Sequence, residues 1–107
     1  MKIPLNGYDV KIIWKLHRGP YYGGKHTSID HLKQGFPSHK GKEIKNAIEK
    51  LVKARLVIVE KKSNEDHVCL NKDKKKIIYE IVDWFNDNMK LIDKEHLEDT
   101  YLEIDIS

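Results

Sequence analysis

The sequence contains a single cysteine, Cys69, so no intramolecular disulfide can form and the fold does not need an oxidising compartment. No apolar run approaches the roughly 20 residues that a membrane-spanning helix requires. Residues Met1 to Asn6 hold no apolar stretch of the length found in signal peptides. We therefore predict a cytoplasmic protein with no membrane partner.

Patterns typical of catalysis and metal binding are also missing. There is no G-x-S-x-G element, and Gly23-Gly24-Lys25 lacks both the preceding strand and the spacing of a phosphate-binding loop. Glu43 and Glu49 lie on a predicted helix surface, with no apolar pocket that would tune an acid–base pair. The six histidines and Cys69 show no pair with metal-ligand spacing. We predict that the protein is not an enzyme and binds no metal or other cofactor.

Charge is unevenly distributed along the chain. Residues 1–92 hold 19 Lys and Arg against 11 Asp and Glu, a net charge of +8. Residues 93–107 hold one Lys against six acidic residues, a net charge of −5. A basic body favours a polyanionic partner. The acidic segment would either repel such a partner or fold back over the basic surface.

Apolar periodicity predicts three helices, at about residues 8–18, 28–34 and 38–55. Asn6 can cap the first helix, and Gly19-Pro20 ends it. Thr27 begins a capping-box-like start to the second helix, which Gly35-Phe36-Pro37 ends. Ser38 is expected to cap the third helix. The inner stripe of that helix is the clearest amphipathic signal in the chain: Ile44, Ala47, Ile48, Leu51 and Val52.

Two β-rich runs, at about residues 56–61 and 67–70, flank the polar turn Lys62–Asp66 and predict a hairpin. A short strand before the second helix is expected at Lys25-His26. The predicted fold class is therefore mainly α with a small β-hairpin. Helix, turn, helix and hairpin in this order outline a winged helix-turn-helix core over residues 1–70.

An extra C-terminal helix is predicted over residues 71–92, followed by an acidic tail or edge strand at 93–107. The apolar stripe of this helix exceeds what a small domain needs to close its core. One interpretation is a homodimer through this helix; the other is a terminal helix lying across its own domain. The predicted dimerisation residues are Ile77, Ile78, Ile81, Trp84, Phe85 and Met89.

Part of the sequence resembles a known group of proteins. The runs Leu32–His39, Glu43–Ala47 and Leu51–Lys53 resemble short archaeal winged helix-turn-helix proteins, in which a Gly-Phe-Pro turn precedes a helix of this kind. Val68-Cys69-Leu70-Asn71 looks like the end of their wing, and the resemblance covers roughly residues 26–85. The resemblance implies the winged fold, and members of this group are described as DNA-binding transcriptional regulators on the basis of the fold alone.

The third helix carries the residues expected to bind duplex DNA. Asn46 is the best candidate for reading a base, because an amide can bond adenine bidentately. Lysines on this helix would contact phosphates, the helix N-terminus at Ser38 favours anions, and the wing stem would touch the backbone. The predicted DNA-binding residues are Ser38, His39, Lys40, Lys42, Lys45, Asn46, Lys50, Lys53, Lys61 and Lys62.

Two observations oppose this interpretation. Glu49 lies in the middle of the proposed face, and the wing tip Ser63–Asp66 carries two acids and no arginine. Lysines also commonly form a merely solvated helix face. The alternative function is a winged-helix module for protein–protein interaction in a transcription or chromosome complex.

Overall fold

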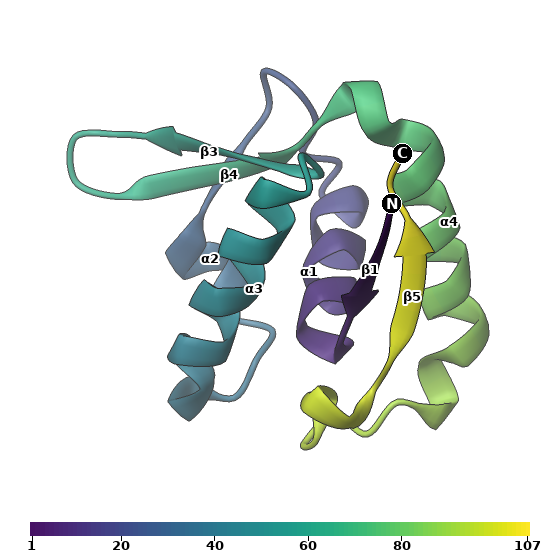
Figure 1. The fold of residues 1–107 in the computed structure, drawn as a ribbon. Helices are drawn as coiled ribbons and strands as arrows, with labels where there is room; N and C mark the ends of the chain where they lie inside the picture. Colours follow the sequence, from purple (N-terminus) through teal and green to yellow (C-terminus); the bar gives the residue numbers. More distant parts are fainter.

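The computed structural model describes all 107 residues as an α+β protein of four helices and two small antiparallel sheets (Figure 1). None of the helices has both the length and the apolar character needed to cross a bilayer. Short 3-10 turns occur at Ser38–Lys40, Lys72–Lys74, Met89–Leu91 and Leu97–Asp99. The main elements are β1 (Lys2–Leu5), α1 (Gly7–Arg18), β2 (Thr27–Ser28), α2 (Ile29–Lys33), α3 (Gly41–Lys53), β3 (Val57–Lys61), β4 (Asp66–Leu70), α4 (Lys75–Asn88) and β5 (Leu102–Asp105).

Helix α1 lies at the centre of the core and contacts α2, α3, α4 and β4. Its start follows the sequence prediction: the Asn6 side chain accepts hydrogen bonds from the backbone N–H groups of Tyr8 and Asp9. The Asp9 side chain accepts in return from the Asn6 N–H, which completes a capping box. The apolar residues of α1 are buried on several sides, as expected for a helix surrounded by other elements.

The turn between α2 and α3 is anchored on α1. Phe36 is buried and stacks on Tyr8, with ring centroids 6.1 Å apart. Lys11 Nζ lies 4.8 Å from the Phe36 ring centroid and donates a 2.6 Å hydrogen bond to the Gly35 carbonyl. The Gly35-Phe36-Pro37 turn therefore has two roles. It ends α2, and the packing of Phe36 on Tyr8 places α3 against α1.

The starts of α2 and α3 differ from the predictions. Thr27 belongs to β2, and the side chain that caps α2 is that of Ser28, which accepts from the His31 N–H. Ser38 caps no helix, because residues Ser38–Lys40 form a 3-10 turn and the α-helical geometry of α3 begins only at Gly41. The turn is held by its backbone instead, with the Lys40 N–H donating to the Pro37 carbonyl.

Arg55 turns the chain from α3 into the hairpin. Its φ of 63° is left-handed, and it stands at the position that glycine normally takes in a Schellman motif. The two hydrogen bonds of that motif are present, from Leu56 N–H to the Leu51 carbonyl and from Arg55 N–H to the Val52 carbonyl. Asn71 Nδ2 also donates to the Arg55 carbonyl at 2.8 Å, so the left-handed residue is held from both sides.

The predicted hairpin is present, and it projects from the helical body (Figure 1). Strands β3 and β4 pair from Val57↔Leu70 to Lys61↔Asp66. The third strand of this sheet is β2 at Thr27–Ser28, rather than Lys25-His26, and it pairs with β4 on the side away from β3.

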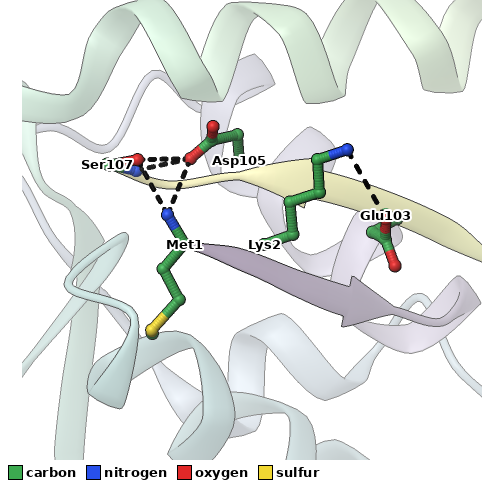
Figure 2. Close-up of polar contacts among 5 residues, drawn as sticks. All are labelled: Met1, Lys2, Glu103, Asp105 and Ser107. Carbon is green, nitrogen blue, oxygen red and sulfur yellow. Dashed lines mark hydrogen bonds and ion pairs between the residues drawn. The ribbon is translucent and has the colours of Figure 1, made fainter.

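Of the two alternatives for the acidic segment, the structure has the edge strand. Strand β5 pairs antiparallel with β1, an N-terminal strand that the sequence analysis did not predict, from Lys2↔Asp105 to Leu5↔Leu102. The Met1 ammonium lies 3.1 Å from Asp105 Oδ1, and Lys2 Nζ lies 3.9 Å from Glu103 Oε1 (Figure 2). Ion pairs as well as strand pairing therefore hold the first and last residues together.

Helix α4 packs across its own domain, chiefly on α1, so most of its apolar stripe is covered within the single chain. Ile78 and Ile81 are 0% exposed, and Ile77 and Phe85 are also buried. Trp84 and Met89 are partly buried against the same core. The sequence argument did not count β5, which also contacts α4, among the elements available to cover the stripe.

Candidate nucleic-acid interface

The outer face of α3 is open to solvent. Lys42, Lys45, Asn46, Glu49 and Lys53 are all exposed. The opposite face buries four of the five residues predicted for the inner stripe, whereas the fifth, Val52, is 38% exposed. The amphipathic pattern therefore orients the helix as expected, except that the apolar stripe is narrower and leaves Val52 at its edge.

A groove of about 650 Å³ lies between the outer side of α3, α2 and the hairpin. Its floor contains apolar side chains, and its charged residues are four lysines and two carboxylates. One of these carboxylates, Asp66, lies 3.4 Å from Lys61 Nζ across the hairpin. The lining residues are Ile29, Lys33, Gly41, Lys45, Ile48, Glu49, Val52, Lys53, Val59, Lys61 and Asp66.

Lys50, one of the predicted phosphate contacts, forms an ion pair within the protein. Its Nζ atom lies 2.6 Å from Oδ2 of Asp9 on α1, and the Asp9 side chain is 0% exposed. Burial raises the pKa of Asp9, against the opposing effect of its hydrogen bonds from Lys50 and the Asn6 backbone. An ammonium that compensates a buried carboxylate is not free for a ligand, so Lys50 is removed from the candidate interface.

Ser38, His39 and Lys40 precede α3 in the 3-10 turn. Ser38 and His39 are exposed, and both precede the N-terminus of α3, which begins at Gly41. Lys40 lies near Glu98 of the acidic segment. The backbone N–H of Glu98 and, to a smaller extent, the Lys40 ammonium hold the pKa of Glu98 below its usual value. Lys40 therefore faces one acid of the chain itself.

The hairpin contributes Lys61 and Lys62 at its outer end, and both are exposed. Lys61 is paired with Asp66, and the tip at Ser63–Glu65 carries an acid. Lys61 ends β3 and lines the groove, whereas Lys62 begins the turn.

The acidic segment leaves most of α3 uncovered. Strand β5 contacts β1 and α4, and the turn at Leu97–Asp99 contacts α1 (Figure 1). Two of its carboxylates, Glu103 and Asp105, are engaged with Lys2 and the Met1 ammonium (Figure 2). The possibility that the acidic end of the chain covers the lysine-bearing face is therefore excluded, apart from Glu98 beside Lys40.

Sequence reasoning missed three residues that line the groove and one ion pair outside it. Lys33 and Ile29 of α2, and Val59 of β3, line the groove because α2 and the hairpin converge on α3. Residues 56–59 are apolar without a break, so the sequence does not indicate which of them faces the groove; this depends on strand register, which sequence does not provide. The Asp9–Lys50 pair joins residues 41 apart in the chain and carries no local sequence signal.

Comparison with known protein families, with curated proteins and with solved structures found no match to the chain.

Proposed function

We propose that this chain is a winged helix-turn-helix protein, similar to the short archaeal group, that binds duplex DNA and regulates transcription. In this proposal α3 enters the major groove and the β3–β4 hairpin lies beside it. The order of α1, α2, α3 and hairpin supports this fold assignment. The single observation that carries the function is the uncovered outer face of α3, whose cationic side chains lie next to a projecting hairpin.

The exposed residues of α3 divide by chemistry. Lys42, Lys45 and Lys53 present ammonium groups to solvent, and these would contact phosphates and fix the position of the protein. Asn46 lies between them on the same face and would bond a base edge. Lys33 and Lys62 extend the cationic surface on either side of the helix.

Fluorescence anisotropy with a labelled mixed-sequence duplex tests the proposal. We expect Lys42→Ala and Lys45→Ala each to weaken binding to every sequence. Lys90→Ala is the matched control, because Lys90 is an exposed lysine on the turn that follows α4. Asn46→Ala should leave overall binding in place and reduce sequence preference by about 1–3 kcal/mol. Equal loss with Lys90→Ala would show that only net charge matters.

The apolar floor of the groove favours a second candidate, a protein-interaction module. Ile29, Val52 and Val59 offer surface that DNA phosphates do not use, and Val52 is among the exposed large apolar residues. A partner segment with apolar residues flanked by acids would fit both the floor and the lysines. Absence of duplex binding at about 50 mM salt, where phosphate contacts are strong, would favour this candidate.

A further inference from the structure

Two histidines that lie 41 residues apart in the chain meet near the turn end of the β3–β4 hairpin. His26 directly precedes β2, and His67 lies on β4 opposite Ser28. The rings meet edge to face with centroids 4.8 Å apart, and their Nδ1 atoms are only 2.8 Å from each other. No other pair of histidines in the structure makes such a contact.

The outer nitrogen of each ring faces a carboxylate. His26 Nε2 lies 3.1 Å from Glu60 Oε2, and His67 Nε2 lies 3.0 Å from Glu65 Oε1. An ionised carboxylate only accepts hydrogen bonds, so both Nε2 atoms carry hydrogen. In neutral rings the two Nδ1 lone pairs then point at each other. Either a proton shared between the two Nδ1 atoms or a metal ion bound by both would remove the repulsion of the lone pairs.

We propose that this pair of Nδ1 atoms binds a divalent transition-metal ion of the Zn²⁺ type. Imidazole nitrogen is a preferred Zn²⁺ ligand, with bonds of about 2.0–2.1 Å. Two such nitrogens in a tetrahedral site are roughly 3.3 Å apart. The rings would therefore separate by about half an ångström from their present distance. This is a small change for two side chains that are 23% and 22% exposed.

The surroundings of the pair fit a metal better than they fit a chance contact. A histidine that ligates a metal usually donates its other N–H to a carboxylate or carbonyl, which fixes the ring orientation. Here Glu60 does this for His26 and Glu65 does it for His67. No third His, Cys, Asp or Glu joins the pair. The remaining positions would hold water, and binding would be weaker than at a four-ligand structural site.

A bound ion would cross-link the hairpin to the segment that precedes β2. Its two ligands come from the segment before β2 and from β4, and the supporting carboxylates come from β3 and the turn. A bound ion would link all three strands of the sheet. Metal binding would therefore stabilise the folded state and reduce local opening of the hairpin, by an amount that grows with the logarithm of the free ion concentration once that concentration exceeds the dissociation constant. This inference does not depend on the proposed DNA binding.

Isothermal titration with Zn²⁺ tests the site in the full chain at neutral pH. We expect one ion per chain, with affinity reduced at least tenfold in both His26→Gln and His67→Gln. His96→Gln is the matched control, because His96 also faces a carboxylate, Asp93 at 2.9 Å, but has no second ring beside it. That variant should bind Zn²⁺ as the unchanged protein does.

Nitrogen-15 NMR of the histidine rings gives a readout that needs no substitution. Added Zn²⁺ should shift the Nδ1 resonances of His26 and His67 to metal-bound values while both Nε2 atoms stay protonated. Absence of binding at about 100 μM Zn²⁺, or Nδ1 resonances that stay unchanged, would overturn the proposal. The pair would then be held by a shared proton alone.

Discussion

The Nζ atom of Lys50 on α3 lies 2.6 Å from Oδ2 of Asp9 on α1, and the same carboxylate oxygen accepts the backbone N–H of Asn6. One buried carboxylate thus caps α1 and ties α3 to it. Its second oxygen, Oδ1, is buried without a hydrogen-bond partner. The orientation of the candidate interface therefore depends on an ion pair on the inner side of α3.

We predict that Lys50→Met destabilises the fold by about 3–5 kcal/mol, because it leaves the Asp9 carboxylate buried and unpaired. Lys45→Met, at an exposed position of the same helix, should change stability by less than about 0.5 kcal/mol. Urea unfolding at pH 7 measures both. The double variant Asp9→Asn with Lys50→Met should recover most of the loss. Equal effects at positions 45 and 50 would contradict the structural role of the pair.

The raised pKa of Asp9 predicts the sign of a pH effect. The folded state binds this proton more tightly than the unfolded state, in which the carboxyl has its ordinary value of 3.8. Below pH 3.8 the carboxyl is protonated in both states, so its ionisation does not destabilise the folded state. As the pH rises, the unfolded state loses the proton first, and the destabilisation is complete once the pH exceeds the raised pKa of the folded state. The stability of Asp9→Asn relative to the unchanged protein should therefore increase from acidic to neutral pH. A difference that stays constant or falls would show that the pKa of Asp9 is not raised by folding.

Ile81→Glu separates the two roles considered for α4. Ile81 is 0% exposed in the single chain, so a glutamate there would bury an unpaired charge and unfold the protein. Tyr79→Glu is the control, since Tyr79 is 46% exposed on the same helix. Circular dichroism and sedimentation should show an unfolded first variant and a folded second one. A folded, monomeric Ile81→Glu derived from a dimeric parent would instead restore the dimer interpretation.

Arg55→Gly should stabilise the protein by about 0.5–1 kcal/mol. The left-handed backbone of Arg55 costs a residue with a side chain about 1–2 kcal/mol, and glycine avoids this cost. Part of the benefit is offset because glycine loses more backbone entropy on folding. Thermal unfolding measures the change. A destabilised variant would mean that the Arg55 side chain makes a contribution that the backbone argument omits.

The parts of the fold that the sequence predicted are those with local signals. Helix α1 and its Asn6 cap, the buried Phe36 break and the β3–β4 hairpin all follow from periodicity and turn chemistry within short windows. The helix starts were less accurate, because Thr27 and Ser28 are both good caps, and the pairing of both residues with the distant β4 places the start of α2 after Ser28.

The remaining features arise from contacts between distant segments. Strand β1 is stable only because β5, about 100 residues later, supplies its partner. The same holds for the Asp9–Lys50 pair and for His26 beside His67. The exposed lysine face of α3 was predictable from periodicity, but the loss of Lys50 from that face was not.

The most direct test of the account is the salt dependence of duplex affinity, measured as log K against log [NaCl] from about 50 to 200 mM. With several exposed lysines contacting phosphates, we predict a slope of about −3 to −5, which becomes shallower by about 2 in the Lys42→Ala, Lys45→Ala double variant. The Lys90→Ala control should keep the full slope. A slope near zero, or no binding at the lowest salt concentration, would contradict the proposal that α3 and the hairpin form a DNA-binding surface.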